Sequence, residues 1–221
     1  MESSRSFWGI VLVLFLLASC ATGEGANADA SAASGAADQM EASQLCVVRH
    51  AQAYRNLEAA PPGLTTEQLN TLTEKGRIQA KKLGAQVPRP VAAVYTSPTG
   101  RTRMTAEVMD LGVPIGLTGK LSKLDGDMAW ETRLENWKRG DDPRPDDGES
   151  LADGRERILE ILDRARTEAA DGKHVVFVTH GDIASLVIGE LKGTPLLERP
   201  INHMIDTGEA VCLPMPRSDT E

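Results

Sequence analysis

The chain has no excess of positive charge, no apolar run long enough to cross a membrane and few cysteines. Its 221 residues carry 24 Lys and Arg against 32 Asp and Glu, which gives a formal net charge of -8. An acidic chain is repelled by nucleic acids and by anionic lipid surfaces, because both carry negative charge themselves. We therefore expect no nucleic-acid partner. We also find no internal repeat, which argues for a single folded unit.

The most apolar run of the sequence lies near its start and is too short to span a bilayer. It covers residues 7–18 and follows Arg5, whereas a spanning helix needs about 20 apolar residues. A short apolar run behind a basic residue is typical of a signal peptide. The tetrapeptide Leu17-Ala18-Ser19-Cys20 resembles the lipobox of bacterial lipoproteins. That resemblance implies cleavage before Cys20 and acylation of Cys20, whose acyl chains would form a lasting membrane anchor.

These features divide the chain into four parts. Residues 1–19 are the lipoprotein signal peptide, 20–44 the lipidated cysteine with a flexible tether of small residues, 45–217 one domain and 218–221 a tail. The domain is long enough to bury its own core. Ala21 after the cysteine favours the outer membrane, with the domain facing the periplasm, over retention at the inner membrane. An ordinary secreted protein is the alternative, and the oligomeric state stays open.

Two cysteines remain besides Cys20. Cys46 and Cys212 both lie in apolar, strand-like segments. An exported protein can form disulfides, so a bridge between them is one alternative. A free buried cysteine is the commoner state in such segments, and we expect two unpaired thiols.

Short apolar runs alternate with helical patterns along the domain. Strands are expected at 45–48, 91–96, 114–117, 175–179 and 210–213, and helices from Thr73 onward and at 99–110, 149–170 and 183–191. This alternation predicts an α/β three-layer sandwich with a mostly parallel central sheet flanked by helices. Residues 125–145 are charged and rich in Trp and Pro, and they are too long for a structureless loop, so we interpret them as a functional lid or insertion.

Three of the predicted strands end at cationic or imidazole side chains. The first runs into Arg49 and His50, the second is followed by Arg101, and the fourth runs into His180. The carboxyl ends of parallel strands share one sheet edge, where ligands bind. Guanidinium groups bind phosphate oxygens in a planar, two-pronged way, and a neutral imidazole can attack phosphorus. The pattern therefore predicts a phosphate site with no metal and no cofactor.

The same segments resemble the histidine phosphatase superfamily, the phosphoglycerate-mutase-like group, in its branch 1. Arg49-His50-Ala51 corresponds to the signature triplet, with alanine in place of the usual glycine. Further matches follow in chain order: Asn56, residues 72–80, residues 97–106, Gly148-Glu149-Ser150 and Thr179-His180-Gly181. The resemblance covers residues 45–211.

The resemblance implies a role for each site residue. His50 would be the nucleophile, while Arg49, Arg101 and His180 would bind the phosphoryl group with Asn56 as a supporting donor. The implied activity is that of a histidine acid phosphatase, which hydrolyses phosphomonoesters or phosphohistidine through a phosphohistidine intermediate. A small phosphorylated substrate and the membrane are then the expected partners.

One departure from the family concerns the general acid. The family has a glutamate where this chain has Lys123, and a lysine does not protonate a leaving oxygen in the same way. Four carboxylates are candidates for the acid: Asp125, Asp127, Glu131 and Asp182. Activity would fall least for substrates whose leaving groups need little protonation, such as phenolates or phosphohistidine.

Two other functions stay open. The lysine favours a catalytically weak phosphoryl-binding or scaffolding lipoprotein that keeps the pocket but has no working acid. A phosphoglycerate mutase fits less well, because export would separate the protein from glycolytic intermediates.

Several other polar and aromatic residues are expected to be structural. His174 and Arg103 should lie at the surface and His203 should hold structure. Trp130 and Trp137 either line a substrate mouth or pack the insertion onto the core.

Overall fold

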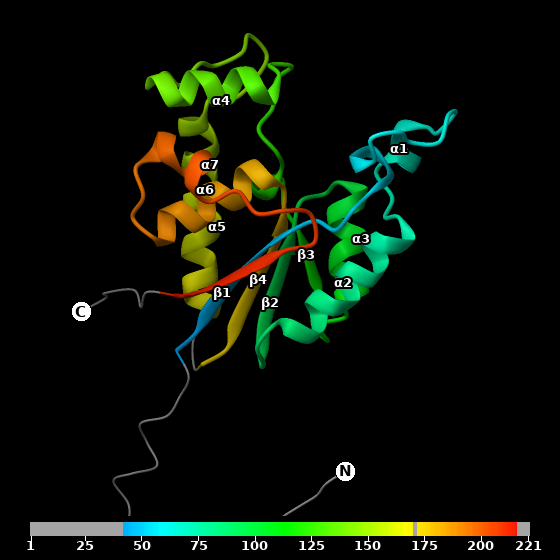
Figure 1. Cartoon of the computed structure of the whole chain (residues 1–221). Helices are drawn as coiled ribbons and strands as arrows, with labels where there is room; N and C mark the ends of the chain where they lie inside the picture. The colour runs from blue at the N-terminus through cyan, green and yellow to red at the C-terminus, as the bar shows by residue number, and fades with distance from the viewer. Residues whose placement is uncertain (1–41, 170–171, 216–221) are drawn as a thin grey trace, which may run out of the picture. The chain divides into compact units, whose positions relative to one another are not determined.

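A five-stranded mixed sheet forms the centre of the domain (Figure 1). The computed structural model describes residues 42–169 and 172–215. The strands are β1 (Gln44–Arg49), β2 (Val91–Thr96), β3 (Ile115–Leu117), β4 (His174–Thr179) and β5 (Ala210–Pro214). Their order is β3-β2-β4-β1-β5, and only the pair of β1 with β5 is antiparallel. The predicted signal peptide, Cys20 and the tail lie outside the described residues.

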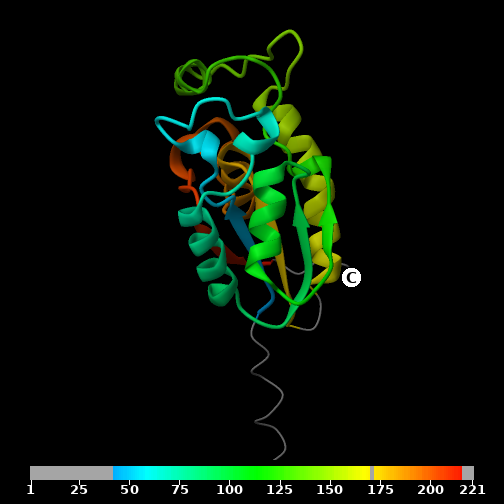
Figure 2. The ribbon, with the colours of Figure 1, turned by 90° about the vertical axis from the view of Figure 1, so that its right-hand side faces the viewer.

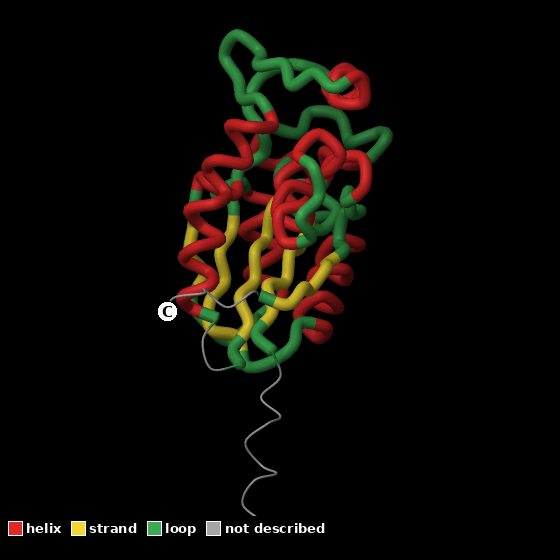
Figure 3. The backbone as a smooth tube through the Cα atoms, turned by 90° about the vertical axis from the view of Figure 1, so that its left-hand side faces the viewer, coloured by secondary structure: helices red, strands yellow, loops and turns green. Residues whose placement is uncertain are grey.

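Helices cover both faces of this sheet, as the two side views show (Figures 2 and 3). The helices are α1 (Thr66–Leu69), α2 (Glu74–Gln86), α3 (Gly100–Met109), α4 (Trp130–Arg139), α5 (Leu151–Glu168), α6 (Gly181–Leu191) and α7 (Arg199–Asn202). Short 3-10 turns lie at η1 (Tyr54–Asn56), η2 (Gly119–Leu121) and η3 (Leu196–Glu198). The predicted three-layer α/β fold is confirmed. Within the described ranges, no helix has the length and apolarity needed to cross a membrane.

The sheet has a hydrophobic core on each of its faces, because side chains alternate between the faces along each strand. Leu45 and Val47 of β1 pack with α5 and α6, whereas Cys46 and Val48 pack with α2 and α3. Successive side chains of a strand point to opposite faces of the sheet, so one apolar run serves both layers. This is why β1 and β4 read as unbroken apolar runs in the sequence.

A glycine lets α2 begin close to the loop that follows β1. A Cβ atom on Gly76 would lie 2.0 Å from the carbonyl oxygen of Gln52, which no real side chain tolerates. Thr73 caps the same helix, because its hydroxyl accepts a hydrogen bond from the Gly76 N–H at 3.0 Å. The first turn of α2 therefore supports the backbone two residues after His50.

The expectation of two free thiols is wrong, because Cys46 and Cys212 form a disulfide. The two residues are direct partners in the antiparallel pair of β1 and β5. The sequence alone does not reveal this pairing, since it depends on β5 returning beside β1 after the chain has built every other strand.

The expectation that His174 lies at the surface is wrong, whereas the structure agrees with both alternatives given for Trp130 and Trp137. The 125–145 insertion contains helix α4, with Trp137 buried in the main core and Trp130 in edge-to-face contact with it. His174 is 1 % exposed rather than at the surface, because it begins β4 between two neighbouring strands. Its Nδ1 accepts a hydrogen bond from the Gln44 N–H at 3.2 Å. Arg103 is exposed as expected, and His203 bonds to Thr194 at 2.7 Å.

Candidate active site

Three neighbouring parallel strands deliver the predicted site residues to one edge of the sheet. Arg49 ends β1 and His50 follows it, Arg101 lies in the first turn of α3 after β2, and His180 caps α6 after β4. A cavity of about 330 Å³ opens there. The residues that line it are Arg49, His50, Arg55, Asn56, Arg101, Lys123, Trp130, His180, Gly181, Asp182 and Met204. The structure thus brings the four predicted catalytic residues and Asn56 together.

His50 is held in one tautomer by its own loop. Its Nδ1 lies 2.9 Å from the carbonyl oxygen of Ala51, which can only accept, so Nδ1 carries the proton. The lone pair of Nε2 is then free, and no described residue bonds to it. Burial lowers the pKa of His50 to about 3, with the charges of Arg101 and Arg49 adding to the effect. The ring is therefore neutral and nucleophilic at neutral pH.

The turn that carries His50 is fixed by backbone bonds on both sides. The His50 N–H donates to the Thr179 carbonyl at 2.9 Å, and the Gly208 N–H donates to the His50 carbonyl at 3.1 Å. The Arg49 N–H donates to the Glu209 carbonyl at 3.0 Å. The loop before β5 thus holds His50 in place.

His180 uses both ring nitrogens to orient other side chains. Its Nδ1 lies 2.9 Å from Nη2 of Arg101, which donates, and its Nε2 lies 3.0 Å from the Ser97 hydroxyl. Burial, followed by the Arg101 charge, holds the pKa of His180 well below its ordinary value. His180 is therefore a neutral acceptor that aligns the Arg101 guanidinium, and its ring meets that of His50 edge to face at 5.5 Å between centroids.

Both site arginines have an unused donor. Arg49 donates through Nη1 to the Ile205 carbonyl at 2.8 Å, and Arg101 donates through Nη1 to the Asn70 side chain. The Nε atoms of both arginines are buried and lack a partner among the described residues. Both arginines line the cavity, and guanidinium groups bind phosphate oxygens in a planar, two-pronged way, so the pair favours an anion there. Burial lowers the pKa of Arg101 to about 10, which still leaves it charged at neutral pH.

A glycine after the second histidine makes room for Arg49. A Cβ atom on Gly181 would lie 2.7 Å from the Met204 sulfur and 3.0 Å from Nη1 of Arg49. A side chain at this position would require the Met204 sulfur and the Arg49 guanidinium to shift.

Only one of the four candidate acids lines the cavity. Asp182 does so, but its Oδ2 accepts the Leu124 N–H at 2.7 Å and its Oδ1 accepts the Ile183 N–H at 2.9 Å. Burial raises the pKa of Asp182. Asp125, Asp127 and Glu131 are exposed and are not among the described residues that line the cavity.

Sequence reasoning missed several residues of the site. Arg55 and Met204 line the cavity, and Asn70 positions Arg101 from outside it. Asn70 has no signal in the sequence, because it lies in the turn after α1 and reaches α3 only in the folded chain. The described residues contain no group of three or more His, Cys, Asp and Glu side chains able to hold a metal ion.

The low pKa of His50 predicts a broad acidic working range. A lowered pKa means that His50 gains its proton only below about pH 3, so its ring stays neutral from about pH 7 to about pH 4. We expect kcat for p-nitrophenyl phosphate at saturation to show no loss with a midpoint near pH 6.5, measured alongside circular dichroism to confirm folding. An acid limb at that midpoint, shared by two aryl phosphates of different acidity, would contradict this assignment.

Comparison with known proteins agrees with this geometry. A sequence model described as the histidine phosphatase superfamily (branch 1) matches residues 45–216. The chain is 31% identical over 166 residues to 2,3-bisphosphoglycerate-dependent phosphoglycerate mutase 2 of Gloeobacter violaceus, covering 66% of this chain and 74% of the relative. It is 29% identical over 153 residues to an uncharacterised phosphatase, PhoE, of Bacillus subtilis, covering 67% and 77%. Among solved structures, YhfR of Bacillus stearothermophilus matches with a TM-score of 0.59 and 28% identity, over 77% of this chain and 90% of that one.

Proposed function

Because this chain belongs to branch 1 of the histidine phosphatase superfamily, we propose that it hydrolyses phosphomonoesters through a phosphohistidine on His50. One observation carries the proposal. A neutral imidazole with a free Nε2 shares a cavity with the guanidinium groups of Arg49 and Arg101. A phosphoryl group in that cavity would place its oxygens beside the guanidinium groups and its phosphorus beside that nitrogen.

The two chemical steps follow from this arrangement. In the first, Nε2 of His50 forms a bond to phosphorus while the bond from phosphorus to the leaving oxygen breaks. Arg49 and Arg101 stabilise the charge on the phosphoryl oxygens, and His180 keeps Arg101 aligned. Asn56, at the exposed side of the cavity, is a supporting donor. In the second step the oxygen of a water molecule bonds to phosphorus while the P–Nε2 bond breaks, which returns the lone pair to His50; the water loses a proton to solvent, and phosphate is released.

Trapping the intermediate tests the proposal. The protein would be mixed with p-nitrophenyl phosphate, quenched at alkaline pH, digested and analysed by mass spectrometry. We expect one phosphoryl group on the peptide that contains His50. Tight binding of inorganic phosphate in calorimetry with no turnover and no labelled peptide would instead favour the scaffolding role. The scaffolding role has support of its own, since the one carboxylate among the described lining residues already bonds to two backbone N–H groups.

The cellular setting is part of the proposal. Cys20 would anchor the protein in the bacterial envelope, with the domain in the periplasm. The disulfide between Cys46 and Cys212 supports this, because disulfides persist in oxidising compartments and are rare in the cytosol. The mutase relatives favour a phosphoglycerate mutase as another candidate. We place the phosphatase first, because an exported protein would not meet glycolytic intermediates.

A further inference from the structure

We propose that the site favours substrates whose leaving group departs as a charged phosphate, as in a phosphoanhydride, and that Lys123 and Arg55 bind this leaving group. The inference rests on the proposed function, since it concerns what is attached to the phosphoryl group that His50 would accept. It also explains why a lysine stands where the family's acid is expected.

The cavity holds more positive charge than one phosphoryl group requires. Four cationic side chains line it, and they can be grouped by position into an inner and an outer pair. Arg49 and Arg101 are the inner pair, with their Nε atoms buried. Arg55 and Lys123 are the outer pair, and both are exposed at the mouth. Because the inner pair already matches the phosphoryl oxygens, the outer pair is available to a second anionic group.

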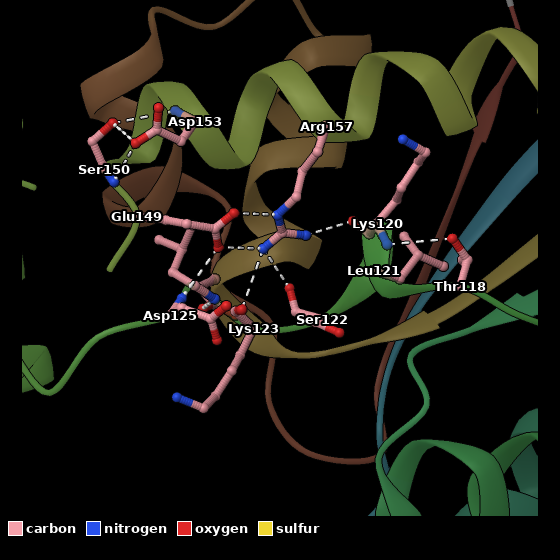
Figure 4. Close-up of polar contacts among 12 residues, drawn as sticks. Thr118, Lys120, Leu121, Ser122, Lys123, Asp125, Glu149, Ser150, Asp153 and Arg157 are labelled. Atoms are coloured by element: carbon pink, nitrogen blue, oxygen red, sulfur yellow. Dashed lines mark hydrogen bonds and ion pairs between the residues drawn. The ribbon is translucent and has the colours of Figure 1, made fainter. Parts of the chain in front are cut away.

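The backbone around Lys123 is fixed by side chains from two helices (Figure 4). Nη2 of Arg157 donates to the Ser122 carbonyl at 2.6 Å and to the Lys123 carbonyl at 3.2 Å. Asp182 holds the following N–H, that of Leu124, at 2.7 Å. Glu149, in turn, pairs with Arg157 at 2.8 Å. The segment is thus anchored on both sides of Lys123.

The Lys123 side chain takes no part in this network. In Figure 4 it extends away from the bonded cluster, and it forms no ion pair with any described residue. Folding has therefore already ordered the backbone that carries the ammonium group, and only the side chain remains to be ordered on binding. The Lys123 ammonium group is therefore available to bind an anion at the cavity mouth.

The outer cations act on the inner groups. Burial is the main cause of the low pKa of His180, and the Lys123 charge lowers it further. Burial likewise dominates the low pKa of His50, to which the Arg55 charge contributes. Both outer cations line the same cavity as the two histidines, so their charges act on these rings across it.

The described residues that line the cavity include no carboxylate that is free to donate a proton. An alkoxide leaving group needs a proton, and Asp182 has both oxygens bonded to backbone N–H groups. A phosphate leaving group needs none. His50 Nε2 bonds to phosphorus, the bridging P–O bond breaks, and its electron pair stays on the bridging oxygen. That oxygen departs as part of a phosphate anion, which the ammonium of Lys123 stabilises.

Leaving-group selectivity in matched variants tests the inference. The assay would compare wild type with Lys123→Gln, Lys123→Glu and the control Lys81→Gln, which changes an exposed residue of α2. The substrates would be inorganic pyrophosphate, p-nitrophenyl phosphate and glycerol 2-phosphate. Wild type should prefer pyrophosphate to glycerol 2-phosphate. Lys123→Gln should lose about tenfold in kcat/KM on pyrophosphate and less than about threefold on p-nitrophenyl phosphate, the effect of losing one charge-assisted contact. Lys123→Glu should lose more on pyrophosphate and gain on glycerol 2-phosphate, while Lys81→Gln should match wild type.

The outcomes separate this inference from the proposed function. An equal loss on all three substrates in Lys123→Gln, or a wild type that prefers glycerol 2-phosphate, would overturn the role of Lys123 while leaving a phosphorylated His50 intact. If no substrate is turned over and His50 is never labelled, the proposed function fails and the inference with it.

Discussion

Replacing His50 with asparagine should reduce turnover of p-nitrophenyl phosphate by about a thousandfold or more, because it removes the atom that bonds to phosphorus. Asparagine keeps a polar side chain of similar size next to the Ala51 carbonyl, so folding should be preserved. The arginines would remain, and the variant should still bind inorganic phosphate in calorimetry. Initial rates and phosphate binding on the same preparation would measure both effects.

A matched histidine provides the control for this variant. His203 bonds to Thr194 and is not among the described residues that line the cavity. His203→Asn should therefore change kcat/KM by less than about threefold, as expected for a contact outside the reacting groups. Retention of a tenth or more of the activity in His50→Asn would rule out His50 as the nucleophile.

Of the substitutions proposed for this protein, those that remove the Cys46–Cys212 disulfide should lower the free energy of unfolding the most. Cys46 and Cys212 are separated by 166 positions in the sequence, so their bond restricts almost the whole unfolded domain. For a loop of this length the chain-entropy model predicts a loss of about 5 kcal/mol in the free energy of unfolding for the Cys46→Ala/Cys212→Ala double variant. Urea unfolding of the detergent-solubilised protein, followed by tryptophan fluorescence, would measure it.

A reducing agent provides an internal control for this experiment, because it breaks the disulfide in the wild type without any substitution. Dithiothreitol should lower the urea midpoint of the wild type toward that of the double variant, and it should leave the double variant unchanged. Coincident urea midpoints for oxidised wild type and double variant would show that the bond contributes nothing to stability.

Sequence pattern predicted those parts of the fold that depend on local periodicity. The strand at 91–96 and the helix start at Thr73 agree with the structure, and the long helix predicted at 149–170 is observed at Leu151–Glu168. The same pattern placed Arg49, Arg101 and His180 at one edge, because parallel strands share their carboxyl ends. These features needed no knowledge of which residues meet across the fold.

The features that were not predicted depend on partners far apart in the chain. The Cys46–Cys212 bond needed the direction of β5, and the burial of His174 needed its place between two strands. Asn70 meets Arg101 only after α1 and α3 have packed. The identity of the cation at position 123 was visible in the sequence, but its fixed backbone depends on Arg157, which lies 34 residues further on.

The backbone bonds from residues 208 and 209 to the His50 turn have a consequence for the newly made chain. His50, the proposed nucleophile, is among the first residues of the domain to be synthesised, and the backbone that holds it is among the last. A chain emerging from a ribosome or a translocation pore therefore carries His50 long before that residue has a defined orientation. Catalytic competence would be gained in a single late event, when β5 docks, so partially synthesised chains would not act on phosphorylated metabolites they meet.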